Sequence, residues 1–192
     1  MSDTTTTPAT RTIDGVELPA PGTWAIDLAH SSANFKVKHL GLGRTRGRFT
    51  QFVGTVEVGE NPVDTTVVLT IDAASVDTHD DGRDEHLRSA DFFDVANNPS
   101  LTFRSTGVRG GGESWKLDGE LAIAGVTKAV SLDVDYEGVT VDPWGGNRAG
   151  FTATTQVNRE DFGLTWNAAL EAGGFLVGKN VSIELEVELV RQ

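Results

Sequence analysis

The chain has 192 residues, 38% of them hydrophobic, which is enough for one packed domain, and no apolar run approaches the roughly 18–20 residues of a membrane-spanning helix. The formal net charge of −12 disfavours binding to nucleic acids and to anionic membrane surfaces, although Arg44, Arg46 and Arg48 form a local basic exception. The absence of cysteine excludes disulfides, a thiol nucleophile and cysteine-ligated zinc.

The first residues of the chain show no regular pattern. Residues 1–12 are rich in threonine, and we predict a disordered tail there, followed by a single domain over residues 13–192. The tail has neither a basic start nor an apolar segment, so it does not resemble a secretory signal peptide, and we expect a cytoplasmic protein. Residues 13–23 are predicted to be irregular, and strand-like sequence starts at Trp24.

Most of the chain after Trp24 alternates polar and apolar residues with the period of a β-strand. Turn residues, many of them glycine, separate most of the runs. Eight runs are visible, at residues 35–39, 52–58, 67–71, 101–105, 115–123, 130–136, 151–157 and 181–189. Short links favour an antiparallel meander, and closing the meander into a barrel removes its exposed edges.

The faces predicted to point into this barrel mix small and large side chains. A barrel of about eight strands is either filled by side chains or holds one small ligand. Small residues opposite large ones fit both descriptions, because they either interlock or leave a slot between them. The residues concerned are Gly54, Ser105, Gly119 and Ala153, beside Phe35, Phe52, Phe103 and Phe151.

One segment, residues 75–103, departs from the strand pattern and predicts a short helix between strands. Asp84 falls in the predicted first turn, where an acidic residue complements the positive end of the helix dipole. Leu87, Ala90 and Phe93 are spaced by three residues and are predicted to share one helix face.

The same segment raises the alternative of a metal or catalytic site. A metal site would use His79, Asp81 and His86, but the separation of the two histidines is not a standard zinc spacing. A G-x-S-x-G motif is absent, which argues against a hydrolase of that type. The favoured interpretation is a non-catalytic protein without a cofactor or a metal ion. The alternative, a histidine-dependent enzyme or metal-binding protein, would use His30, His39, His79 and His86.

Two ionisable residues extend the apolar inward faces. His39 continues the face of Val37, and Arg159 continues the face of Val157. One ionisable group at the end of an apolar interior is an ordinary anchor for the head group of a ligand. The alternative for His39 is a hydrogen bond to the backbone that caps the core. The arginines within residues 44–48 either bind a phosphate head group or offset the acidic surface.

Short motifs occur in a fixed order from about Trp24 to Val190. They are Trp24-x-Ile26-Asp27-x-x-His30-Ser31, Phe35-x-Val37-x-His39, Arg48-Phe49-x-x-Phe52-x-Gly54, Ser75-Val76-x-Thr78, Arg83-Asp84-x-His86-Leu87, Asp91-Phe92-Phe93-Asp94, Pro99-x-Leu101-x-Phe103-x-Ser105, Gly119-x-Leu121-x-Ile123-x-Gly125-Val126-Thr127-Lys128 and Arg159-x-Asp161-Phe162-Gly163. This ordered set resembles the YceI-like family of polyisoprenoid-binding, lipocalin-like proteins.

The resemblance implies an all-β fold, an eight-stranded antiparallel lipocalin-like barrel with one short helix between strands and a long apolar channel. It implies non-catalytic binding, carriage or sequestration of an isoprenoid lipid, such as a polyprenyl phosphate or an isoprenoid quinone, or of another long-chain amphiphile. Nucleic acid and stable membrane insertion are not expected, and a homodimer is compatible with the family.

Within this resemblance, the helical segment is interpreted as a plug that Arg83, Asp84 and His86 fix in place. Phe92 and Phe93 are candidates to close one end of the channel. The residues predicted to bind the lipid are Phe35, Val37, His39, Phe52, Val56, Leu69, Ile71, Phe92, Phe93, Leu101, Phe103, Leu121, Ile123, Leu132, Val134, Phe151 and Arg159.

Overall fold

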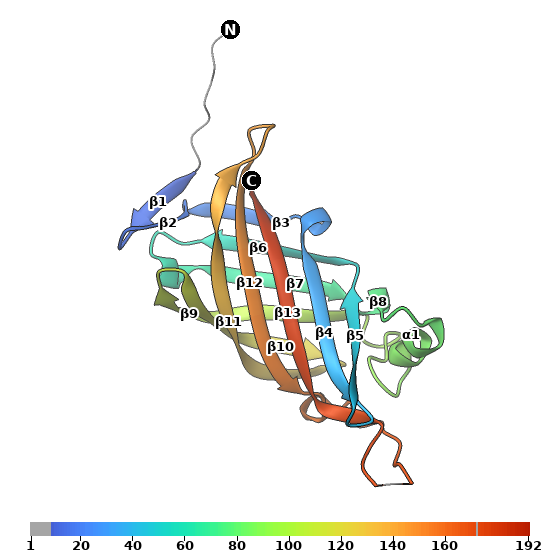
Figure 1. Cartoon of the computed structure of the whole chain (residues 1–192). Coiled ribbons are helices and arrows are strands. Elements are labelled where there is room, and N and C mark those ends of the chain that lie inside the picture. The colour runs from blue at the N-terminus through green and yellow to red at the C-terminus, as the bar shows by residue number, and fades with distance from the viewer. Residues whose placement is uncertain (1–8, 172) are drawn as a thin grey trace.

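Strands dominate the computed structural model, which describes residues 9–171 and 173–192 (Figure 1). The strands are β1 (Thr10–Ile13), β2 (Val16–Pro19), β3 (Gly22–Ile26), β4 (Ser32–His39), β5 (Gly43–Phe49), β6 (Phe52–Val58), β7 (Thr66–Asp72), β8 (Val76–Asp77), β9 (Ser100–Gly111), β10 (Ser114–Ile123), β11 (Val126–Val141), β12 (Asn147–Asn158) and β13 (Val177–Arg191). The helices are α1 (Asp81–Arg88) and four short 3₁₀ turns, η1 (Leu28–His30), η2 (Pro62–Asp64), η3 (Ala73–Ser75) and η4 (Arg159–Phe162).

A closed antiparallel ring of eight strands forms the barrel, and this confirms the predicted fold class. The ring runs β3-β6-β7-β9-β10-β11-β12-β13, and it closes because β13 pairs with both β12 and β3. Strand β13 also pairs over its first part with β4, which continues to β5 and β8. The barrel is therefore extended on one side by a second set of paired strands, visible beside β13 in Figure 1.

Aspartate caps mark two of the places where long strands bend. Asp27 accepts a hydrogen bond from the Ala29 N–H and starts the short turn η1 between β3 and β4. Asp72 does the same for the Ala74 N–H and starts η3 between β7 and β8. A side-chain cap satisfies backbone donors that leave the strand ladder. Each bend thus redirects one continuous strand from the main ring into the extension.

The N-terminal segment corrects one expectation. Residues 13–23 were predicted to be irregular, but β1 and β2 form a hairpin around Asp14 and Gly15, whose φ angles are 51° and 83°. Positive φ at both central residues is the geometry that an Asp-Gly pair favours. Of the predicted tail, residues 1–8 lie outside the described residues, and the first strand begins at Thr10.

Helix α1 is present where the segment 75–103 predicted one, but it is shorter. The Asp80 side chain accepts from the Arg83 N–H at 2.9 Å and caps the N-terminus, and the helix ends at Arg88. Ala90 and Phe93 therefore lie beyond the helix, and the predicted shared face with Leu87 is wrong. Within the part of the chain that the structure describes, no helix is long and apolar enough to cross a membrane.

Small and large side chains interlock along the barrel wall. A Cβ atom at Gly119 would lie 2.3 Å from the Phe103 ring, and one at Gly47 would lie 2.3 Å from the Phe35 ring. These glycines leave room for the rings to lie flat against the wall, since a methyl group there would overlap them. Interlocking thus explains part of the small/large pattern, and the cavity described next accounts for the remainder.

Candidate functional site: an apolar cavity with a basic end

An elongated cavity of about 480 Å³ occupies the barrel interior. This volume falls within the roughly 300–1,000 Å³ typical of small-molecule sites. All eight ring strands and both β4 and β5 contribute to its wall. Side chains therefore do not fill the barrel.

The shape of the cavity follows from strand β13. Alternate residues of β13 from Val181 to Leu189 point into it, and Val177 extends the wall further. The twelve residue steps from Val177 to Leu189 cover about 40 Å at roughly 3.3 Å per residue, or about 30 Å along a barrel axis tilted by about 40°. A space this long suits an extended chain better than a compact metabolite.

Every residue predicted to bind the lipid lies in the cavity wall. The set comprises Phe35, Val37, His39, Phe52, Val56, Leu69, Ile71, Phe92, Phe93, Leu101, Phe103, Leu121, Ile123, Leu132, Val134, Phe151 and Arg159. Their position is a finding, whereas their contact with a ligand stays a prediction.

Several residues that line the cavity were not predicted from the sequence. Leu164, Trp166 and Leu176 come from the connection between β12 and β13, and Thr78 and Leu87 come from the region of α1. The connection has no period of 2 or 3.6, so its inward residues carry no pattern. The motif Arg159-x-Asp161-Phe162-Gly163 just before it was the one available signal.

The charge of the wall is opposite to that of the whole chain. The chain has 28 Asp and Glu against 16 Lys and Arg, but no carboxylate lines the described cavity. The cationic residues Arg11, Lys38, Arg83 and Arg159 do line it. An apolar space with only positive groups at its margin favours a ligand with an anionic or electron-rich head.

Arg159 is the most buried of these cations, with 5% of its surface exposed. Its Nε donates to the Gly178 carbonyl at 2.9 Å, and its Nη1 donates to the carbonyls of Leu164 at 2.5 Å and Trp166 at 2.9 Å. The buried Nη2 has no hydrogen-bond partner among the described residues. Burial lowers the pKa of Arg159, but a guanidinium stays protonated in proteins. A buried charge with an unused donor is a costly arrangement that an anionic ligand would offset.

Lys38 and His39 lie at the same end as Arg159. His39 pairs with Val177, the residue before the Gly178 that accepts from Arg159. The His39 side chain is exposed and forms no hydrogen bond within the described residues, which does not support the predicted backbone cap. We call this end of the cavity, defined by Lys38, His39 and Arg159, the basic end.

Helix α1 is fastened beside the cavity by three of its side chains. The buried Asp84 carboxylate accepts from the Thr78 backbone N–H at 2.9 Å and from its hydroxyl at 2.5 Å. Arg83 donates to the Thr78 carbonyl at 2.8 Å, and Arg88 donates to the carbonyls of two residues on the neighbouring turn and β8. Two of the predicted fixing residues, Arg83 and Asp84, thus have that geometry.

His86, the third predicted fixing residue, works differently. Its Nε2 lies 2.9 Å from an Asp91 carboxylate oxygen, and its ring contacts Trp166 edge-on with centroids 4.6 Å apart. Phe92 packs against the same Trp166 ring, at 5.5 Å. The pair His86 and Phe92 therefore joins the region of α1 to the connection before β13, while Phe93 packs on Phe49 at 5.6 Å.

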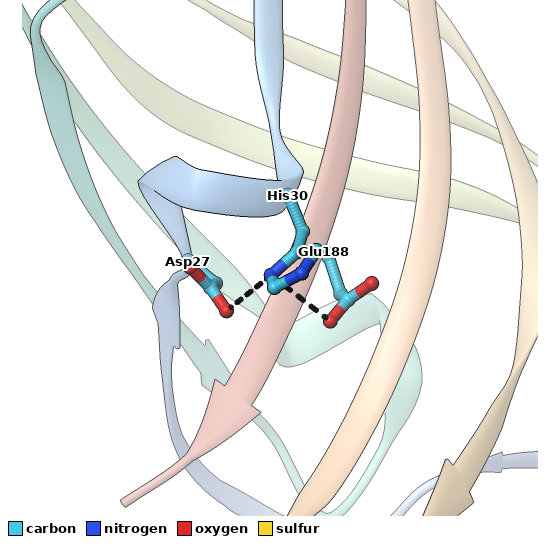
Figure 2. A group of neighbouring side chains, drawn as sticks. All are labelled: Asp27, His30 and Glu188. Atoms are coloured by element: carbon cyan, nitrogen blue, oxygen red, sulfur yellow. Dashed lines mark hydrogen bonds and ion pairs between the residues drawn. The ribbon is translucent and has the colours of Figure 1, made fainter. Parts of the chain in front are cut away.

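The histidine-based alternative finds one cluster, shown in Figure 2. His30 Nδ1 lies 2.9 Å from an Asp27 oxygen and 4.0 Å from a Glu188 oxygen, and across the described ranges this is the only such group of three. Arg148 Nη1 donates to both carboxylates, at 2.7 and 2.5 Å. A guanidinium thus already neutralises them, and it holds the pKa of Asp27 at about 2, with His30 as the second cause. His79, Asp81 and His86, the set considered as an alternative metal site, are not brought together in the described residues.

Comparisons with known proteins agree with this architecture. Residues 24–189 match the YceI-like domain family. A UPF0312 protein of Pseudomonas aeruginosa is 40% identical over 85% of this chain and 83% of its own length. Protein YceI of Escherichia coli O6:H1 is 43% identical over 70% of this chain and 71% of its own length.

Solved structures show the same fold. BcnA of Burkholderia cenocepacia superposes with a TM-score of 0.74 at 23% identity, over 85% of this chain and 98% of its own. A polyisoprenoid binding domain from Saccharophagus degradans gives 0.66 at 16% identity, over 88% and 98% of the two chains. From the family match over residues 24–189 and the 40% identity to a relative covered over most of its length, we conclude that this chain belongs to the YceI-like family.

Proposed function

We propose that this protein is a non-catalytic carrier or sequestering protein for an isoprenoid lipid, either a polyprenyl phosphate or an isoprenoid quinone. The observation that carries the proposal is the long cavity of about 480 Å³ whose wall is apolar along the whole of β13. The structural likeness to a polyisoprenoid binding domain from Saccharophagus degradans supports the choice of lipid.

The energetics of apolar burial are sufficient for useful affinity. Ten buried methylene equivalents contribute roughly 8 kcal/mol at about 0.8 each. A micromolar complex needs about 8.2 kcal/mol, and ordering a flexible chain removes part of what a longer chain adds. Apolar contacts set few angular requirements, so the depth of the cavity would select chain length.

The basic end supplies an anchor for the lipid head. Arg159 keeps an unused buried donor there, and Lys38 and His39 line the cavity beside it. A phosphate would satisfy that donor with a charge-assisted hydrogen bond, and a quinone carbonyl would satisfy it with a weaker one. The head would then lie at the basic end and the chain would run toward β1 and β2.

The test is to ask what the purified protein holds. Extraction with organic solvent and mass spectrometry should find a co-purifying isoprenoid, and added polyprenyl phosphate or quinone should raise the melting temperature. An empty cavity together with no thermal shift for either lipid would overturn the proposal.

A matched pair of variants shows whether binding uses the cavity. Ala153 points into the cavity and is 7% exposed, whereas its neighbour Thr154 faces solvent on the same strand. Ala153→Phe should fill the channel and abolish the thermal shift, and Thr154→Phe should leave it intact. Equal binding by both variants would show that the lipid lies elsewhere.

Three further expectations stay predictions. They are the cytoplasmic location, the homodimer compatible with the family, and the absence of a nucleic-acid partner. The absence of catalysis belongs to the proposal and is checked by recovering the bound lipid unchanged.

A further inference from the structure

The hairpin formed by β4 and β5 carries positive charge without an acidic residue. Residues 28–56 contain five of the 16 Lys and Arg of the chain and none of its 28 Asp and Glu. In a chain with a net charge of −12, such a segment is an island of opposite sign.

The register of the hairpin places like charges opposite each other. Lys36 pairs with Arg46, and Lys38 pairs with Arg44, and all four side chains are exposed. Like charges in directly opposed positions destabilise a sheet. Arg48 forms an ion pair with Asp77 at 3.0 Å, but within the described residues the other four cations have no carboxylate within 4.0 Å. Asp77 and Glu184 line a surface groove with Lys36 and Arg46 but form no direct ion pair with any of the four, so an anionic partner would relieve the repulsion between the opposed cations.

An apolar tip lies at the end of the same hairpin. Leu42 is 92% exposed and Leu40 is 40% exposed, and the φ angle of Leu40 is 55°, in the left-handed region where leucine is disfavoured. The Leu40 N–H donates to the Leu176 carbonyl at 2.9 Å, which brings Phe175, 59% exposed, to the same end. We define the apolar tip as Leu40, Leu42 and Phe175.

We propose that the apolar tip and the hairpin cations dock this protein on the surface of an anionic lipid membrane. Exposed large apolar side chains backed by Lys and Arg are the combination that binds reversibly at a bilayer interface. Lys38, His39 and Leu176 line the cavity at this end, so docking places the basic end against the bilayer. The role of this docking rests on the proposed function, because docking would let a lipid pass between the bilayer and the cavity.

The overall negative charge does not prevent this docking. Salt screens charges beyond a Debye length of about 8–10 Å. The Lys38–Arg44 pair is two residues from Leu40 and Leu42, or about 7 Å at roughly 3.4 Å per residue. The hairpin cations therefore act on the membrane at short range, and Glu171, exposed four residues before Phe175, is the carboxylate nearest in sequence to the apolar tip that opposes them.

Trp144 offers an internal control at another exposed turn. It is 87% exposed on the turn between β11 and β12, and its backbone N–H donates to the Asp142 carboxylate. In Figure 1 this turn lies at the opposite end of the barrel from the connection before β13. Arg148 pairs with the Asp142 carboxylate, so this turn combines an apolar side chain with no excess positive charge to attract an anionic surface.

Vesicle co-sedimentation of the full chain tests the proposal. The probes are vesicles of phosphatidylcholine with phosphatidylglycerol, and vesicles of phosphatidylcholine alone. Wild-type protein should bind the anionic vesicles, lose that binding at high salt, and leave the neutral vesicles unbound. Failure of the wild-type protein to bind anionic vesicles would overturn the proposal. Binding of an oligonucleotide or an acidic protein to the same hairpin would then identify that molecule as the partner instead of the membrane.

Two pairs of variants distinguish the effect of the hairpin and the apolar tip from the effects of net charge and of exposed apolar side chains elsewhere. Arg44→Glu/Arg46→Glu should weaken vesicle binding at least about 30-fold, at roughly a factor of five for each charge removed. Arg104→Glu/Lys128→Glu changes the net charge equally at exposed positions on other strands and should bind close to wild type. Leu42→Ser should weaken binding about 10-fold, and Trp144→Ser should not change it. Equal losses within either pair overturn the proposal.

Lipid loading keeps this test distinct from that of the proposed function. Neither Arg44 nor Arg46 lines the cavity, so the double variant should still take up detergent-solubilised polyprenyl phosphate with the wild-type thermal shift. Ala153→Phe should show the reverse, with vesicle binding intact and the shift lost. Loss of both properties in the hairpin variant counts against a separate docking surface.

Discussion

Two arginines at the two ends of β12 differ in what surrounds them. Arg148, near the start of the strand, donates to Asp27, Asp142 and Glu188 at 2.5–2.7 Å. Arg159, directly after the strand, donates only to backbone carbonyls and leaves Nη2 without a partner among the described residues. The first is a complete structural cluster. The second is a buried cation without an anionic partner among the described residues, and the contrast supports our proposal that a ligand head binds there.

Removing Arg148 is expected to have the largest effect on stability. Arg148→Met leaves three carboxylates facing one another with His30 as the remaining neighbour, so the melting temperature at neutral pH should fall by several degrees. Lipid affinity should stay at the wild-type value, as measured by titration of the folded variant. A variant that melts like wild type would show that the cluster contributes nothing net.

Removing Arg159 should instead change binding. Arg159→Met is expected to weaken polyprenyl phosphate binding about 10–100-fold, as the loss of one or two charge-assisted hydrogen bonds. The neutral polyprenol, which shares the chain and lacks the charge, serves as the control ligand and should bind the variant and wild type equally. Unchanged phosphate affinity in calorimetry would remove Arg159 from the site.

The Asp27 carboxylate gives the comparison a pH dependence. Its pKa is about 2 in the folded protein against 3.8 ordinarily, so it stabilises the fold above about pH 4, and this stabilisation is lost as pH falls toward 2. Asp27→Asn should cost about 1 kcal/mol at pH 7, and the difference from wild type should shrink between pH 4 and 2 in urea titrations. A difference that is constant with pH would contradict the assignment to Arg148.

The smallest effect is expected at an exposed ion pair. Arg109 holds the pKa of Asp118 at about 2 as well, through bonds of 2.8 and 3.0 Å, but both side chains face water. Asp118→Asn should therefore change stability less than Asp27→Asn does, and high salt should erase the change. An equal, salt-resistant loss would show that the pKa shift alone, rather than the exposure of the pair, determines its contribution to stability.

Alternation predicted seven of the eight ring strands because each of them has one face inside. The run at residues 35–39 is β4 of the extension, and the eighth ring strand is β3, which was not among the predicted runs. The period-2 runs at residues 115–123 and 181–189 lie within β10 and β13 as expected. Strand β5 was not predicted because its polar face is a run of arginines and its other face contains Gly43 and Gly47, so it offers little hydrophobic contrast. The β1–β2 hairpin was missed although its Asp14-Gly15 pair carried the signal for a tight turn.

The wall of the cavity followed from the inward faces, but its charge distribution did not. Arg159 was a candidate because it extends the face of Val157, yet only the fold shows that three carbonyls hold it and that no carboxylate of the described residues forms an ion pair with it. Arg148 gave no such signal, since its partners Asp27 and Glu188 are 121 and 40 residues away in sequence. Pairing over such separations depends on strand order, which a single sequence does not state.

The position of β13 in the barrel has a consequence for folding. This last strand is the one that joins β12 to β3 and β4, over Val177–Arg191. Until it is in place, three strand edges are unpaired, and such edges are sites of intermolecular association. Closure must therefore be a late step dominated by contacts distant in sequence, and a slow one. Ending the chain just before Val177, which removes β13, should turn the closed barrel into an open sheet that exchanges strands with other copies of the protein.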